Sequence, residues 1–344
     1  MKSKSLSAAI LCLAALVGFG AGAGAWELGA RALGMGGAYV ALSDDIASLA
    51  FNPAGLSNAS FQVGIGLGSR DLLAVTRFVS LLQDPSSLPA GAAIDVATLS
   101  GISIAGFGAG FAALGSVSAM DSCDGFELCA EGEYLSQIVL GHGRRIAALP
   151  IGLSDLRAGV SVKRIDTRRV EYRRTIPLGG DYVATTEDWR GEGYSFSLGV
   201  QVKASEVFTI GIAANDVVSS LTWTGTRTTT TVAGGTETPV AESLGTTSDR
   251  LNPRYRLGVA IKPPFLGVTL AGDLGSDGSI RYGVEKDLFF GALSLRFGGI
   301  RADGTATTTA GLGIHLGPVR IDAGAGSADG FKTVTTMIEG SVRF

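Results

Sequence analysis

The chain has 344 residues, of which 46% are hydrophobic, 17% are charged and 51 are glycine. Its formal net charge of −3 leaves no electrostatic footprint for nucleic acid, so nucleic-acid binding is excluded. Beyond the N-terminus no run of 18 apolar residues occurs, and no transmembrane helix is predicted.

Residues 1–25 are predicted to be a cleaved secretory signal peptide. Lys2 and Lys4 precede an apolar run over residues 6–17, and the small-residue stretch AGAGA ends at Ala25. The alternative, an uncleaved membrane anchor, would need roughly 20 apolar residues, more than this run provides. Export to an oxidising compartment follows.

The segment GARALGMGGAYVALSDDIASLAFNPAGLS, residues 29–57, is the most specific motif. Glycines permit positive φ angles and close backbone approach, and Pro53 keeps Asn52 extended. Asp44 and Asp45 are predicted to cap a short helix over residues 46–51; acid/base catalysis or cation binding is the weaker alternative, because adjacent side chains diverge. The candidate site residues are Gly34, Gly36, Gly37, Asp44, Asp45, Phe51, Asn52, Pro53 and Ala54.

The rest of the chain alternates between apolar and polar residues, which is typical of β-strands. In the last strand Ile338 and Val342 face one way, whereas Glu339 and Arg343 face the other. Strands are predicted to start near Phe61, Ile102, Tyr134, Arg157, Tyr194, Val207, Ser220, Arg254, Leu266, Ile280, Phe290, Thr305, Pro318 and Thr333. Residues 71–101 are hard to interpret, and the run 72–82 fits a helix or a strand.

A soluble sandwich would also place charges on one face of each strand. Short connections at residues 288–290 and 316–318, against a long polar loop predicted for residues 224–249, favour an outer-membrane barrel instead. Because hydrocarbon cannot hydrogen-bond a free strand edge, such a sheet must close. We therefore predict an all-β fold, a transmembrane antiparallel β-barrel of about 14 strands (range 12–16). The charges predicted to face its lumen are Arg254, Arg256, Asp273, Arg281, Glu285, Arg296, Arg320, Asp322, Glu339 and Arg343.

The motif at residues 29–57 resembles the N-terminal segment of the FadL-like outer-membrane transport family and of the related PorV/PorQ group. The terminal Phe344 resembles the signal read by the barrel-assembly machinery. The resemblance implies a hatch over residues 26–58 inside a barrel over residues 59–344, in the outer membrane of a Gram-negative cell.

The function that this resemblance implies is passage of small hydrophobic molecules across the outer membrane. The alternative is a PorV/PorQ-like shuttle or partner-binding component of a protein secretion system. The hatch residues fit either a purely architectural plug or, for Phe51, Asn52 and Pro53, the lining of a ligand path. A hydrophobic ligand site is also conceivable where Phe107, Phe111, Phe126 and Leu128 cluster in sequence.

Catalysis and metal binding find little support. Cys123 and Cys129 are predicted to form a disulfide in the oxidising compartment, because a thiolate zinc site would need more ligands. His142 and His315 lie in strand-like stretches, and nothing marks a catalytic partner for either. No enzyme activity, metal or cofactor is predicted; the expected partners are outer-membrane lipid, a hydrophobic small molecule and, in the alternative role, secretion proteins.

Overall fold

The computed structural model describes residues 28–58, 61–70, 78–88, 91–120, 123, 126–146, 155–175, 181–330 and 332–344. The predicted signal peptide, residues 1–25, lies outside these residues. Among the described residues, no helix has the length and apolar character needed to cross a membrane.

Fifteen strands form one antiparallel sheet. They are β1 (Phe61–Ser69), β2 (Ala93–Ile104), β3 (Phe107–Met120), β4 (Phe126–Ile146), β5 (Asp155–Thr175), β6 (Tyr182–Lys203), β7 (Phe208–Ala233), β8 (Thr236–Asp249), β9 (Arg254–Ile261), β10 (Val268–Gly275), β11 (Ile280–Leu288), β12 (Leu293–Ala302), β13 (Thr305–Leu316), β14 (Val319–Ser327) and β15 (Thr335–Arg343). The described helices are α2 (Ala30–Gly34), α3 (Ser48–Phe51), η1 (Pro53–Asn58), α4 (Phe78–Gln83), η3 (Pro85–Ser87) and η4 (Phe289–Gly291).

The sheet closes into a barrel because β1 pairs with β15 and β6 pairs with β7. Strand β9 pairs with the first part of β7 and β8 with its second part, so β8 and β9 share one position in the ring. The result is a 14-stranded antiparallel barrel, which confirms the predicted fold class.

The division of the chain into strands predicted from the sequence contains two errors, and their effects on the strand count cancel. The single strand expected near Ile102 is the hairpin of β2 and β3, whereas the strands expected near Val207 and Ser220 are both part of β7. Residues 224–249 are no loop: they form the β7–β8 hairpin, which turns at Gly234 and Gly235. Both glycines have positive φ, 55° and 81°, as tight hairpin turns require.

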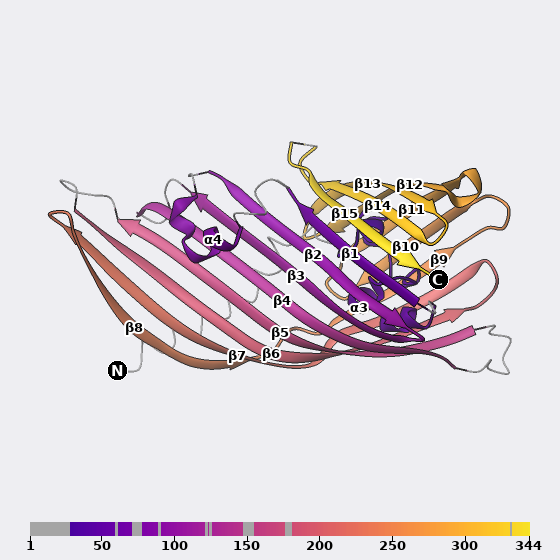
Figure 1. Ribbon diagram of the computed structural model, residues 1–344, viewed down its shortest axis with the longest axis horizontal. Coiled ribbons are helices and arrows are strands. Elements are labelled where there is room, and N and C mark those ends of the chain that lie inside the picture. Colours follow the sequence, from indigo (N-terminus) through magenta and orange to yellow (C-terminus); the bar gives the residue numbers. More distant parts are fainter. Residues whose placement is uncertain are drawn as a thin grey trace.

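The barrel wall is much taller on one side. Strands β4–β7 have 21 to 26 residues, whereas β9–β11 have eight or nine. The tall part, here the extended wall, consists of residues 126–137 of β4, 164–175 of β5, 182–193 of β6, 220–233 of β7 and all of β8. It forms the left end of the molecule in Figure 1, opposite the end where the C-terminus lies.

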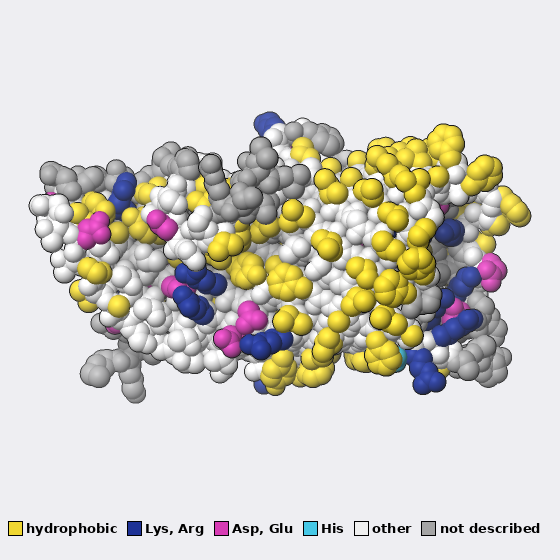
Figure 2. Space-filling model, in the orientation of Figure 1, with side chains coloured by type: hydrophobic (Ala, Val, Ile, Leu, Met, Phe, Trp, Pro, Cys, Tyr) yellow, Lys and Arg dark blue, Asp and Glu magenta, His cyan; other side chains and the backbone are white. Residues whose placement is uncertain are grey.

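Large apolar side chains cover the outside of the barrel between the extended wall and the end where the C-terminus lies; this end is called the lower end below. Outward residues such as Val160 (52% exposed), Ile212 (52%) and Leu257 (46%) form this apolar belt, and Figure 2 shows it over the right part of the molecule. Phe107 and Phe111 also face outward, at 64% and 38% exposure. The predicted ligand site around these two phenylalanines therefore does not lie in the lumen.

Residues 28–58, called the inner segment below, lie inside the barrel and pack against strands from both halves of the wall (Figure 1). Its side chains make up most of a buried apolar cluster in which Leu33, Tyr39, Ile46, Leu49 and Phe51 are at most 3% exposed. Burial of this cluster fixes the segment in the lumen, since each large apolar side chain contributes about 1.5–3 kcal/mol.

Candidate functional site: the blocked lumen

Glycines allow the inner segment to touch the barrel wall. Gly36 has φ +63°, and a Cβ at this position would lie 2.5 Å from the backbone nitrogen of Gly299 and from the carbonyl oxygen of Tyr282. A Cβ on Gly34 would lie 3.0 Å from Cα of Gly311. Gly37 also has positive φ, 69°. The three glycines of the motif therefore lie where backbone meets backbone or where the chain turns.

Asn52 joins the inner segment to the wall. Its side chain is fully buried, and its Nδ2 donates to the carbonyl oxygens of Val40 at 3.0 Å and Val200, on β6, at 3.1 Å. Its Oδ1 accepts a hydrogen bond from the backbone N–H of Ala54 at 3.2 Å. All three hydrogen-bonding groups of this side chain are thus used, which offsets the cost of burying them.

Pro53 and Ala54 lie against Gly159 of β5, where the wall has no side chain. A Cβ on Gly159 of β5 would lie 2.3 Å from the carbonyl carbon of Pro53 and 2.4 Å from the backbone nitrogen of Ala54. Phe51 is 3% exposed and meets the ring of Tyr39 edge-on, with the centroids 5.3 Å apart. In this structure Phe51, Asn52 and Pro53 are packed residues, and neither of the two cavities described below is lined by them.

Asp44 and Asp45 were predicted to cap a helix, but the structure gives them different roles. Helix α3 begins at Ser48 after Ala47, which makes no side-chain cap. Asp45 accepts from the N–H of Ala47 at 3.0 Å and from the hydroxyl of Tyr39. The carboxylate of Asp44 instead pairs with Arg31 at 2.8 Å. The capping prediction is therefore wrong for Asp44, because a buried arginine competes for its charge.

The neighbouring groups move the pKa values of these aspartates in opposite directions. Burial raises the pKa of Asp45, and the adjacent Asp44 carboxylate raises it further. Burial opposes the ionisation of Asp44 too, but the guanidinium groups of Arg31 and Arg343 outweigh it and hold its pKa below the usual value. At neutral pH Asp44 is therefore the charged partner of Arg31.

Glu285 is the centre of the predicted lumen charges. Arg31 of the inner segment contacts it with two donors, Nε at 2.9 Å and Nη2 at 3.0 Å. Arg296, which is fully buried, donates from Nε to Glu285 at 2.7 Å and from Nη1 to Asp322 at 2.6 Å. Such a chain of paired charges stabilises the segment only while it stays complete, since an unpaired buried charge is costly.

The other predicted lumen charges also face the interior. Glu339 accepts the backbone N–H of Ala30 at 3.1 Å, and Arg256 lies over the ring of Phe51, 5.7 Å from its centroid. Arg343 donates to the carbonyl oxygen of Asn58 at 3.2 Å. Arg281 donates to Ser279. Arg320 lines a cavity described below.

Three further residues anchor the inner segment, and of these only Asp273 was predicted from the sequence, as a lumen charge. Asp273 accepts the backbone N–H groups of Tyr39 and Val40 at 2.8 and 3.0 Å. Gln201 donates to the carbonyl oxygen of Ser43 at 2.9 Å. Arg31 is the third. The alternation of β10 and β6 does predict inward side chains at 273 and 201, but nothing in the sequence marks their partners.

The inner segment leaves a polar cavity at the end of the barrel where the C-terminus lies. Its volume is about 460 Å³, and charged groups line it. Its lining includes Arg31, Asp44, Lys262, Glu285, His315 and Arg320. His142, the other histidine, lies against the ring of Phe107 at 4.2 Å between centroids. Among the described residues, no group of acidic, histidine and cysteine side chains could hold a metal ion.

Cys123 and Cys129 are joined by a disulfide. Cys129 lies in the part of β4 that belongs to the extended wall, and its partner residue in the neighbouring strand is Met120 of β3. The bridge therefore closes the connection between β3 and β4 at the top of the extended wall, away from the lumen charges.

The fold of this chain is similar to that of several solved barrels, although sequence alone finds no relative. No protein-family model matches the sequence, and no curated protein matches it. The toluene transporter TodX of Pseudomonas putida matches with a TM-score of 0.65 and 14% identity, over 92% of this chain and 99% of that chain. The toluene transporter TbuX of Ralstonia pickettii gives 0.63 and 13%, over 92% and 98%.

A FadL homologue of Pseudomonas aeruginosa matches with a TM-score of 0.62 and 10% identity, over 92% of this chain and 98% of that chain. At these identities the likeness establishes the fold: a 14-stranded barrel of the FadL type. None of these matches bears on the predicted PorV/PorQ resemblance or on a secretion role.

Proposed function

We propose that this protein is an outer-membrane channel for small hydrophobic molecules and that the inner segment is its hatch. The observation that carries the proposal is a closed barrel whose apolar belt faces outward while a separate segment, held by hydrogen bonds and ion pairs, fills its lumen. Closure and the belt suit a membrane, where every backbone group must be paired.

The transport role draws on the neighbours in fold. Two of them are toluene transporters and one is a FadL homologue, and the match extends over 92% of this chain. The inner segment fills the described lumen through a buried apolar cluster and a chain of paired charges. Passage therefore requires the hatch to shift and these pairs to rearrange, and the export signal would deliver the protein to the outer membrane.

The test is uptake of radiolabelled toluene by cells that lack the gene, with and without a plasmid that restores it. Restored cells should take up toluene several-fold faster, whereas a hydrophilic sugar of similar size should enter at the same rate in both. Equal toluene uptake in the two strains would overturn the transport proposal. Stable co-purification with secretion proteins in that case would favour the alternative role, which remains a prediction from the sequence resemblance.

A further inference from the structure

Helix α4 lies on the outer face of the extended wall. The ring of Phe78 contacts Tyr134 at 6.4 Å between centroids and fills the space above Gly115. Leu81 and Leu82 join Phe78 in a buried cluster with side chains of β2–β4. Gly115 lies on the same face of β3 as the outward Phe107 and Phe111, because side chains alternate along a strand. The helix therefore covers the outer face of the wall.

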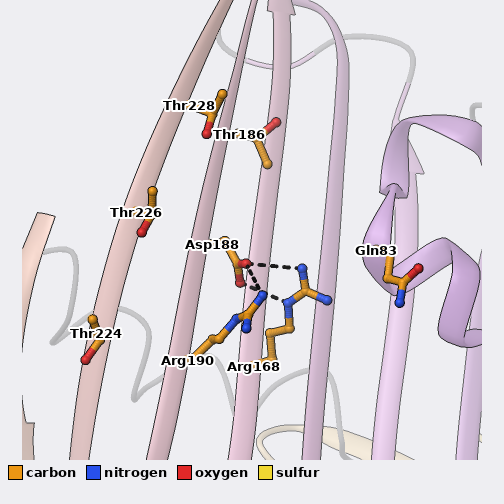
Figure 3. Close-up of a pocket in the computed structure, with 8 residues that line it drawn as sticks. All are labelled: Gln83, Arg168, Thr186, Asp188, Arg190, Thr224, Thr226 and Thr228. Carbon is orange, nitrogen blue, oxygen red and sulfur yellow. Dashed lines mark hydrogen bonds and ion pairs between the residues drawn. The ribbon is translucent and has the colours of Figure 1, made fainter. Parts of the chain in front are cut away.

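Beside this helix is a cavity of about 490 Å³ on the same outer face (Figure 3). Its lining residues are Gln83, Arg168, Thr186, Asp188, Arg190, Thr224, Thr226 and Thr228. They are neighbours in the sheet: Arg168 pairs with Arg190, Asp188 with Thr226, and Thr186 with Thr228. Arg168 lies an even number of residues from the outward Val160 on unbroken β5, so the whole set faces outward.

The cavity lies just above the apolar belt. On β6 the belt ends at Tyr194, which is 51% exposed; Arg190 is four residues further up the strand and Thr186 eight. At about 3.3 Å per residue and a tilt of about 45°, the cavity spans roughly 9–19 Å above the edge of the belt. Outer-membrane barrels carry their longer connections outside the cell, and the long connection from β1 to β2, which holds α4, lies at the end of the extended wall, so this wall faces outside the cell.

The groups in the cavity suit a hydroxyl-rich ligand. Asp188 accepts from Nε and Nη2 of Arg168, at 2.9 and 3.2 Å, and from Nη2 of Arg190 at 3.2 Å. The carboxylate of Asp188 offsets only one of the two guanidinium charges, so the cavity keeps one net positive charge. The side chain of Arg190 is 70% exposed and keeps donors for a ligand. Threonine hydroxyls and the Gln83 amide add donors and acceptors, and no large apolar side chain lines the cavity.

Most threonine hydroxyls of the cavity make no hydrogen bond to the described residues. Within the described residues, Thr224 contacts only Thr246, at 3.5 Å, and no hydrogen bond uses the hydroxyl of Thr186, Thr226 or Thr228. Figure 2 shows few hydrophobic side chains over the left part of this face, in contrast to the belt. A row of free hydroxyls beside a salt-bridged cluster is a surface that sugar hydroxyls can hydrogen-bond.

We propose that this cavity binds the sugar headgroup of a glycolipid in the outer leaflet. The inference rests on the proposed outer-membrane location but not on transport. A glycolipid is favoured over a soluble sugar because the cavity opens on the lipid-facing side, directly above the belt. A ligand whose acyl chains lie against the belt reaches it without a separate binding step, which raises its effective concentration.

The test uses purified protein first shown to be folded by its heat-dependent gel mobility. Binding of lipopolysaccharide with a complete sugar core is compared with binding of lipid A that lacks the core, by native mass spectrometry. The variant T226V/T228V removes two hydroxyls from the cavity and keeps the β-branched shape. Its matched control is T229V/T231V, on the same strand but on the opposite face.

Lipopolysaccharide should bind the T226V/T228V protein about tenfold more weakly, since two neutral hydrogen bonds are lost, and the T229V/T231V protein like the unaltered one. Equal binding by both variants would overturn the proposal, and so would equal binding of lipid A without its core. Equally tight binding of the released core sugar would refute the glycolipid assignment. A protein that folds but does not transport toluene would refute the proposed function and leave this test intact.

Discussion

At the scale of single residues, Asn52 joins the inner segment to the barrel wall. Asn52→Ala would leave the carbonyl oxygens of Val40 and Val200 without their donor inside the barrel, a loss of about 1–3 kcal/mol. We expect this variant to fold and to leak small ions in planar bilayers. Asn252→Ala, in an exposed connection, is the control and should leave conductance unchanged. Equal conductance of the two variants would contradict this role of Asn52.

The aspartate pair offers a second comparison at this scale. Because the pKa of Asp44 is lowered, its stabilising effect is present above its usual pKa and is lost as the pH falls through the lowered value. The pKa of Asp45 is raised, so its contribution is greatest at low pH and is lost as the pH rises through the raised value. At pH 7 Asp44→Asn should therefore destabilise the protein and Asp45→Asn should not.

The expected loss for Asp44→Asn is only about 1 kcal/mol, because its side chain is 36% exposed and solvent screens the pair with Arg31. The measurement is the urea midpoint of refolded protein in lipid vesicles at pH 7. A lower midpoint for Asp45→Asn than for Asp44→Asn would contradict the assignment of the charged partner.

The inward charges of the strands could be predicted from the sequence, but their partner in the inner segment could not. The alternation predicted that Glu285, Arg296, Asp322 and Glu339 point inward, and all four do. It did not reveal Arg31, since one arginine among apolar residues resembles a solvated side chain. Its partner Glu285 lies 254 positions away, and only the closed barrel brings the two together.

At the scale of elements, the contact between α2 and the wall depends on glycine backbones. Gly36→Ala would add a Cβ 2.5 Å from two backbone atoms and force an alanine to φ +63°. Gly304→Ala, in the β12–β13 turn, carries the same strain at φ +73° but has open space around it. The difference between the variants isolates the steric contact from the backbone strain.

We expect Gly36→Ala to displace residues 30–40 from the wall and Gly304→Ala to leave them in place. Limited proteolysis of the folded proteins measures this: new cleavage within the inner segment should occur for Gly36→Ala alone. Equal resistance of the two variants would show that the close approach of Gly36 to Gly299 does not hold the segment.

Elements were predicted unevenly for a physical reason. Strands β9–β15 were found because the lipid face is apolar and the lumen face is charged, so the period of two is visible. Above the belt both faces meet water, as in the threonine run of β7, and the periodicity disappears. The β7–β8 hairpin was therefore taken for a loop, although β-branched threonine favours strands.

At the scale of the whole molecule, the position in the membrane follows from where the apolar belt ends. Ile212 lies on β7 within the belt, and Thr222 lies on the same outward face ten residues further, in the extended wall. Arginine on the lipid face costs about 2–4 kcal/mol at the bilayer midplane and about 0–1 kcal/mol near the interface. Ile212→Arg should therefore destabilise the inserted barrel strongly and Thr222→Arg little.

Both variants place an arginine on the outward face of one strand at different heights, so the general effects of an added arginine cancel between them. Reversible urea unfolding from lipid vesicles gives the free energy of each. A cost of about 2 kcal/mol or more confined to Ile212→Arg places the membrane around the belt and leaves the cavity beside α4 above it. Comparable costs at both positions would move the membrane up the wall, whereas no cost at either would mean that the belt does not contact lipid.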